Sequence, residues 1–110
     1  MSIRLGDEAP NFTAITTDGE IDFHAWKADS WAILFSHPAD FTPVCTTELG
    51  RTAALKDEFA KRNTKAIAVS VDPIVDHHAW APDIAEVGGI PVNFPIVADP
   101  DRVVSEAYDM

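Results

Sequence analysis

The residues most capable of chemistry lie around the single cysteine of the chain, Cys45. This cysteine ends the stretch SHPADFTPVC, which begins at Ser36 and includes Pro38 and Thr42. A short apolar run precedes the stretch and a helical pattern follows it, so the thiol falls in the first turn of a predicted helix. Unpaired backbone N–H groups at a helix start favour a thiolate, which is the nucleophilic form of cysteine. The position alone leaves a buried structural cysteine as the alternative, because free cysteine is among the most buried residue types.

Polar groups precede the cysteine at short spacing. Thr42 lies one turn ahead of Cys45, where its hydroxyl can point at the sulfur, contact a bound oxygen or cap the helix. Pro38 and Pro43 restrict the loop and can shield a thiolate from water. His37 adds an imidazole at the end of the preceding strand. The stretch therefore favours a reactive thiol.

Apolar patterns predict the strands that must position this stretch. Three short runs without alternation predict strands covered on both faces, at residues 31–36, 66–71 and 94–98. Before them, FTAITTDGEIDF places Asp18-Gly19 between two alternating runs, which predicts a hairpin.

A long helical pattern covers residues 44–62. Its polar face includes Gly50 and Arg51, and Pro43 suits its first turn. Its apolar arc consists of Leu49, Thr52, Ala53, Leu55, Phe59 and Ala60.

A second helical pattern covers residues 74–87. Pro82 is expected to break or restart it, and Gly88-Gly89 to end it. A short final helix is expected after Asp99-Pro100. The order of a hairpin followed by β-α-β-α-β-α predicts an α/β fold with a mostly parallel sheet and helices on both faces. Ligands of such sheets bind where strands end and helices begin, which is the place of Cys45.

Composition and charge narrow the possible functions. The 110 residues suit one domain, and 46% apolar residues suffice for a packed core. A formal net charge of −10 disfavours nucleic acid and anionic membranes, and no apolar run is long enough to span a bilayer. One cysteine cannot form an internal disulfide, and the N-terminus lacks a secretory pattern. We expect a single domain over residues 1–110, in the cytoplasm.

A histidine-rich segment superficially suggests a metal site. His77 and His78 lie beside Asp72 and Asp76, but adjacent histidines diverge on a helix and no HExxH-type spacing occurs. We interpret the segment as a solvated helix surface and expect no metal and no other cofactor. The tryptophans are expected in the core or at an interface: Trp26, Trp31 and Trp80.

Three stretches together resemble a known family. Pro38, Thr42 and Cys45 match the Pro-x-x-x-Thr-x-x-Cys motif of peroxiredoxins. The longer FSHPADFTPVCTTELGR, with VSVDPIVDHHAWAPDI and NFPIVADPDRVVSEAYDM in the same order, resembles the one-cysteine class of that family. The resemblance covers nearly the whole chain. It implies a thioredoxin-like three-layer α/β/α fold with an N-terminal hairpin.

The resemblance also implies the activity and the roles of the site residues. Cys45 would be the peroxidatic cysteine of a thiol-dependent peroxidase, acting on hydrogen peroxide and organic hydroperoxides through a sulfenic acid. Thr42 would bind the peroxide, Pro38 would shield the site, and His37 and Glu48 would support the pocket. The sulfenic acid is the first, reversible product of cysteine oxidation. With no second cysteine, an external thiol or another reductant must reduce it.

The chain departs from the family pattern at its end. Peroxiredoxins continue beyond SEAYDM with two more strands, one of which carries an arginine that contacts the cysteine. Arg51 lies on the polar face of its helix, and no matching motif surrounds the other arginines: Arg4, Arg62 and Arg102. We therefore expect a domain incomplete at its C-terminal end, with residues 31–36 as an open edge that favours a homo-oligomer or another association. The alternative to a working peroxidase is a catalytically impaired thioredoxin-like module.

Some one-cysteine peroxiredoxins are similar in carrying a lipase-like second site. Its serine and histidine positions match Ser30 and His24, but Ala28 and Ala32 stand at its glycine positions. A serine nucleophile also needs an orienting acid, and the family's aspartate lies beyond this chain. We expect Ser30 to cap a loop instead.

Overall fold

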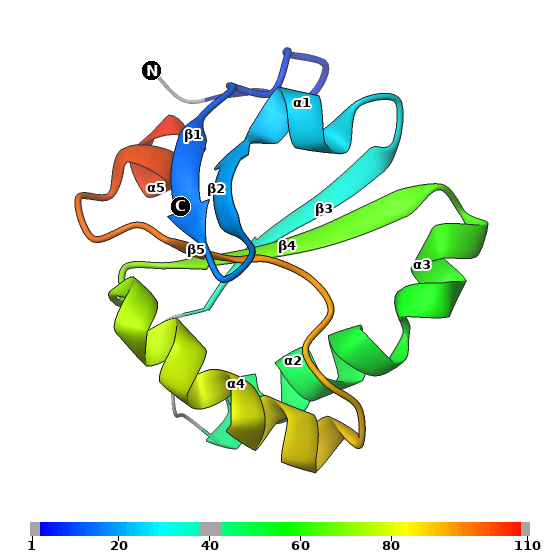
Figure 1. Cartoon of the computed structure of the whole chain (residues 1–110). Coiled ribbons are helices and arrows are strands. Elements are labelled where there is room, and N and C mark those ends of the chain that lie inside the picture. Colours follow the sequence, from blue (N-terminus) through cyan, green and yellow to red (C-terminus); the bar gives the residue numbers. More distant parts are fainter. Residues whose placement is uncertain (1–2, 38–42, 109–110) are drawn as a thin grey trace.

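One mixed sheet organises the protein, with its strands in the order β2-β1-β5-β4-β3 (Figure 1). The computed structural model describes residues 3–37 and 43–108, and of Pro43 and Val44 only the backbone. The strands are β1 (Thr13–Thr16), β2 (Gly19–Asp22), β3 (Trp31–Ser36), β4 (Thr64–Ser70) and β5 (Ile96–Ala98). The helices are α1 (Phe23–Lys27), α2 (Pro43–Ala54), α3 (Lys56–Lys61), α4 (Ile74–Gly88) and α5 (Val103–Ala107).

The predicted hairpin and parallel strands are confirmed. β1 and β2 pair antiparallel with Thr16 opposite Gly19, and the φ of +95° at Gly19 suits a residue without a side chain. β3, β4 and β5 run parallel, whereas β1 joins β5 antiparallel. The pairing of β1 with β5 attaches the hairpin to the parallel sheet.

Apolar clusters cover both faces of the central strands. Alternate residues of β4 face opposite sides, so Ala66 and Ala68 join one cluster while Ile67 and Val69 join the other. The first cluster packs under α2 and α4, and the second contains Val104 of α5. The expected three-layer α/β/α arrangement is therefore confirmed, as Figure 1 shows.

The C-terminal helix is attached to the strand end by a buried carboxylate. Asp99 is 4% exposed and accepts hydrogen bonds from the backbone N–H groups of Val104 and Ser105 at 3.1 and 2.8 Å. Tyr108 then donates its hydroxyl to the carbonyl oxygen of Pro10, and burial raises the pKa of this hydroxyl. These contacts confirm the helix predicted after Asp99-Pro100.

β3 differs from the prediction of a strand covered on both faces. It pairs only with β4 among the described residues, and Trp31 and Ile33 are 74% and 44% exposed. The strand is the edge that the family resemblance predicted, and Trp31 is not a core residue. Trp80 is fully buried, as expected.

The helices correct two further predictions and add one element. The pattern over residues 44–62 forms two helices, α2 and α3, because Leu55 has a ψ of 8° instead of a helical value. Pro82 lies within α4 without ending it, since this residue is exposed and the His78 carbonyl that loses its N–H partner lies on the exposed side. A short helix that the sequence did not predict, α1, follows β2 directly, with the side chain of Asp22 accepting from the Ala25 N–H.

The contact between α2 and α4 corrects the place of Gly50. This residue was predicted on the polar face, but it is buried against Gly88 of α4. A Cβ built on Gly88 would lie 2.7 Å from the Gly50 carbonyl oxygen, and one built on Gly50 would lie 3.0 Å from the Gly88 Cα. The two glycines therefore permit the helix carrying Cys45 to approach α4 backbone to backbone.

We predict that Gly88→Ala destabilises the protein by about 1–3 kcal/mol, because the new methyl group overpacks the helix contact. Helix propensity alone predicts the opposite sign, since alanine is a better helix former than glycine. Chemical denaturation measures the difference, and Glu86→Ala on the exposed side of α4 is the matched control. An unchanged or raised midpoint for Gly88→Ala would contradict the close packing.

Candidate active site

Cys45 is the third residue of α2, beyond the end of β3 where the chain leaves the sheet. It is 6% exposed, forms no disulfide and packs in the cluster that contains Leu49 and Trp80. α2 begins at Pro43, so the thiol lies in the turn whose backbone N–H groups lack helical acceptors. This is the place expected from the sequence, at the start of the helix that follows β3.

His37 follows β3 directly, before the segment that leads to Cys45. Its backbone N–H donates to the Val69 carbonyl oxygen at 3.1 Å, which extends the ladder between β3 and β4 by one residue. The residue is 5% exposed, and the centroid of its ring lies 5.0 Å from that of Trp80 and 6.0 Å from that of His77, both on α4. The imidazole is therefore held by packing as well as by its backbone.

The prediction of a solvated histidine surface is wrong for His77. This residue is fully buried, and its Nε2 lies 3.0 Å from the Val97 carbonyl oxygen, whereas His78 is exposed. His77, Trp80 and Ile84 follow the i, i+3, i+7 spacing of one helix face, a signal that could have placed His77 in the core. No group of metal-ligating side chains occurs among the described residues.

Trp80 adds a contact to α2 that the sequence did not reveal. Its Nε1–H donates to the Thr46 hydroxyl at 2.9 Å, one residue after the cysteine. Thr46 is itself buried, at 8% exposure. Sequence spacing gives no sign of this contact, because the two residues come from different helices.

The other predicted site residues are placed as follows. Pro38 and Thr42 lie outside the described residues. The side chain of Glu48 is exposed on α2, one turn beyond Cys45, and Arg51 is exposed on the same helix. The sequence prediction that Arg51 lies on the polar face is thus confirmed.

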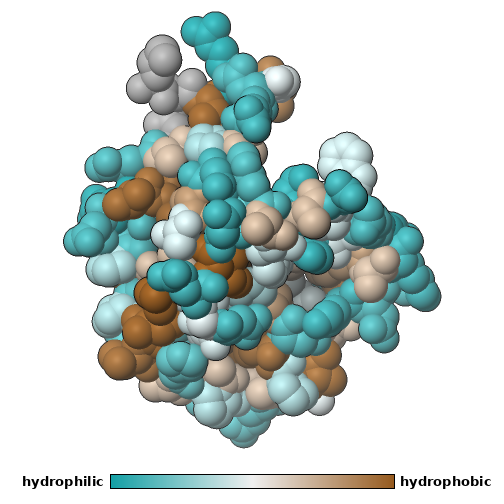
Figure 2. All heavy atoms as spheres, turned by 45° about the horizontal axis from the view of Figure 1, so that its top comes forward, coloured by the Kyte–Doolittle hydropathy of each residue, from teal (hydrophilic) through white to brown (hydrophobic). Residues whose placement is uncertain are grey.

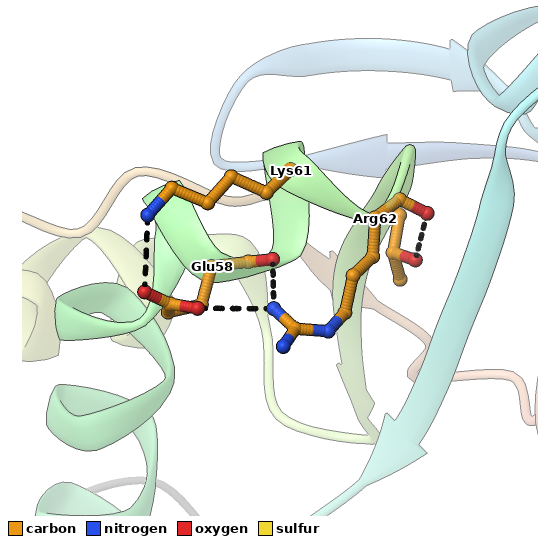
Figure 3. Close-up of polar contacts among 4 residues, drawn as sticks. Glu58, Lys61 and Arg62 are labelled. Carbon is orange, nitrogen blue, oxygen red and sulfur yellow. Dashed lines mark hydrogen bonds and ion pairs between the residues drawn. The ribbon is translucent and has the colours of Figure 1, made fainter.

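Arg62 is engaged away from the cysteine turn, at the end of α3. Its Nη1 donates to Glu58 Oε2 at 3.0 Å and to the Glu58 carbonyl oxygen at 2.9 Å. Figure 3 shows this pair together with Lys61, whose Nζ lies 3.4 Å from Glu58 Oε1. These side chains are half exposed or more, and such surface pairs contribute little stability.

Ser30 and His24 do not form a serine–histidine pair. The Ser30 hydroxyl donates to the Lys27 carbonyl oxygen at 2.6 Å, so it caps the turn after α1 as expected. His24 Nε2 lies 2.7 Å from the Ala9 carbonyl oxygen; a carbonyl only accepts, so this nitrogen is protonated and is no base for a serine.

We predict that Ser30 does not react with a fluorophosphonate probe, because its hydroxyl donates to the Lys27 carbonyl oxygen and His24 Nε2 donates to the Ala9 carbonyl oxygen. Mass spectrometry of the treated protein should find no adduct at Ser30, while a serine hydrolase labelled in parallel serves as the positive control. A Ser30 adduct that disappears in His24→Gln would overturn this assignment.

The fold and the cysteine turn together define a thioredoxin-like protein with a thiol at the start of a helix. The profile of the AhpC/TSA family matches residues 5–110, and the chain belongs to this family. Peroxiredoxin-6 of Gallus gallus is 64% identical over 110 residues, covering 96% of this chain and 49% of that protein. The 1-Cys peroxiredoxin of Dictyostelium discoideum is 49% identical over 108 residues, covering 98% of this chain and 45% of that protein.

Solved structures agree with these relatives. A yeast mitochondrial 1-Cys peroxiredoxin, studied for thiol resolution by the glutathione and thioredoxin systems, superposes with a TM-score of 0.95 at 51% identity. The alignment covers 98% of this chain and 51% of that one. The chain thus has the thioredoxin-like fold of the peroxiredoxins and spans about half the length of the curated relatives it matches.

Proposed function

We propose that the chain is a thiol-dependent peroxidase of the one-cysteine peroxiredoxin class, serving antioxidant defence and redox homeostasis. The observation that carries the proposal is the place of Cys45 in the first turn of α2, in a chain that belongs to the AhpC/TSA family. The substrates are hydrogen peroxide and organic hydroperoxides. The redox-active centre is Cys45.

The reaction is a displacement at peroxide oxygen. The thiolate of Cys45 attacks the terminal oxygen, an S–O bond forms, the O–O bond breaks, and water or an alcohol leaves after taking up a proton. The sulfur loses two electrons to the peroxide and becomes a sulfenic acid. An external thiol then condenses with the sulfenic acid, releasing water, and a second external thiol exchanges with the mixed disulfide to restore Cys45.

The surrounding residues have separate roles in this proposal. Thr42 orients the peroxide with its hydroxyl, and Pro38 keeps water from the thiolate. His37 and Glu48 support the pocket from β3 and α2. The buried imidazole of His37, held against Trp80, is consistent with a fixed pocket wall.

Charge and hydropathy bear on partners and location. The surface in Figure 2 is mostly hydrophilic, with separate apolar areas, and the formal net charge of −10 opposes binding to nucleic acid. No helix within the described part of the chain is long and apolar enough to cross a membrane. We place the protein in the cytoplasm because its only cysteine must stay reduced to react; one relative is a mitochondrial peroxiredoxin of Saccharomyces cerevisiae.

We further propose that residues 1–110 form one thioredoxin-like domain, which associates through β3. The Trp31 N–H donates to the residue before β4 and the His37 N–H donates to Val69 of β4. The alternate N–H groups therefore point to the open edge, namely those of Ala32, Leu34 and Ser36. The strand contains no charged residue, and Trp31 and Ile33 expose apolar surface beside this edge. Such an edge accepts a further strand, which supports a homo-oligomer or another partner.

A second candidate is a catalytically impaired thioredoxin-like module, because Arg51 is exposed nearly two turns beyond Cys45 and Arg62 is paired with Glu58. A charge-assisted hydrogen bond contributes roughly 1.5–3 kcal/mol. At the transition state this equals about one to two decades of rate. The measured rate of peroxide consumption decides between a working peroxidase and this module.

We predict that mild peroxide treatment produces one sulfenic acid, on Cys45. A dimedone-type trap followed by mass spectrometry should find the adduct there, and Cys45→Ser should abolish both the adduct and peroxide consumption. Met1 and Met110 provide internal controls for general oxidation. Oxidised methionine beside an unmodified Cys45 in folded protein would refute the proposed function.

We predict that Thr42→Val slows sulfenic acid formation more than tenfold while changing stability little, because valine keeps the shape but lacks the hydroxyl. If Thr42 is only a helix cap, its loss should instead lower stability by about 1 kcal/mol at an unchanged peroxide rate. Stopped-flow peroxide kinetics and thermal melts of the same two proteins distinguish these results.

We predict that the unmodified chain self-associates and that Ile33→Lys reduces this association, because a charge beside the edge opposes strand pairing. Sedimentation velocity over a range of concentrations measures the effect. Val75→Lys is the matched control, since it adds the same charge at a 67% exposed position on α4. A compact monomer with a sharp melt at every concentration would contradict the association.

A further inference from the structure

Two ring side chains of α4 reach both elements that flank the cysteine. Trp80 donates its Nε1–H to the Thr46 hydroxyl at 2.9 Å, and its ring centroid lies 5.0 Å from that of His37. His77 lies one turn earlier on α4, 6.0 Å from His37 between ring centroids. Residues three apart project from the same side of a helix, so one face of α4 contacts both the end of β3 and the first turns of α2.

The His77 ring is fixed by the strand beneath it. Its Nε2 lies 3.0 Å from the Val97 carbonyl oxygen of β5, which only accepts, so Nε2 is the protonated nitrogen. His77 and Trp80 are both 0% exposed. His77 thus anchors α4 to the sheet one turn before Trp80. This contact fixes the part of α4 from which the Trp80 side chain projects.

We propose that Trp80 is a positioning residue for the cysteine turn of α2. This inference rests on the proposed function of Cys45. Helix ends fray, and a thiolate at a helix start depends on backbone N–H groups that keep their orientation. The indole N–H holds the hydroxyl of Thr46, the residue after Cys45, and so restrains the turn.

The alternative is that Trp80 is a core residue with no effect on the thiol. The two accounts predict different effects of a variant on stability and on the reactivity of Cys45. Loss of packing alone lowers stability. Loss of a restraint on the turn also lowers the reactivity of the cysteine at neutral pH. At this pH an ordinary thiol is mostly protonated, and only stabilisation of the thiolate makes it reactive. At pH 10 ordinary thiols are ionised, so the rate there reports accessibility alone.

The experiment is a double-mutant cycle with the full 110-residue chain, using Trp80→Phe, Thr46→Val and the combined variant. Iodoacetamide alkylation of Cys45 is timed at pH 7 and pH 10, and the ratio of the two rates is compared. We expect each single variant to lower this ratio about three- to tenfold, the effect of one hydrogen bond. The combined variant should lower it no further than either single one.

Ile84→Val is the control for lost packing, because Ile84 is a fully buried residue of the same helix face that lies one turn beyond Trp80. It should lower the melting temperature and leave the alkylation ratio unchanged. A ratio unchanged in Trp80→Phe, or independent and multiplying effects of the two substitutions, would overturn the positioning role.

A peroxide arm separates this inference from the function on which it rests. The unmodified chain and Trp80→Phe are treated with hydrogen peroxide and a sulfenic acid trap. Slower trapping in the variant supports both proposals. A lowered alkylation ratio with no trapping in the unmodified chain supports the positioning role and refutes the peroxidase.

Discussion

The backbone contact between α2 and α4 is the constraint on which the candidate site depends. Gly50 and Gly88 let the two helices approach until a single added methyl group would collide with main-chain atoms. At this distance the Trp80 indole reaches the Thr46 hydroxyl and the apolar side of α2 covers β4. The helix that carries Cys45 is therefore placed by its neighbour as much as by the sheet.

The sheet contributes the second constraint. β4 and β5 are buried on both faces, which fixes the register of β3 and hence the position at which the chain leaves the sheet at His37. A site formed where a parallel strand ends and a helix begins follows from this topology. Its buried imidazoles are those of His37, just after β3, and His77 of α4, and the His37 ring lies near both the His77 ring and the Trp80 indole. Within the described part of the chain, the same topology leaves Trp31 and Ile33 exposed at the open edge of β3.

Local signals predicted most of the elements, since each depends on neighbouring residues. The hairpin at Asp18-Gly19, the parallel order of the buried runs and the helix stop at Gly89 follow from turn chemistry and periodicity. Predictions failed where a distant partner decides the outcome. Gly50 appeared polar because glycine lacks a side chain, and His77 appeared solvated because its acceptor, Val97, lies on another strand.

The sequence by itself determined the candidate nucleophile and its place along the chain, because a cysteine behind a proline-bounded loop at a predicted helix start is encoded within a few positions. It also determined the family, through three stretches in the right order. Only the tertiary structure decided which groups surround that turn. Thr46 and Trp80 are separated by 34 positions in the chain, and no local propensity specifies a hydrogen bond between two helices. The close approach of those helices brings the two side chains together, because both must cover the same face of the sheet.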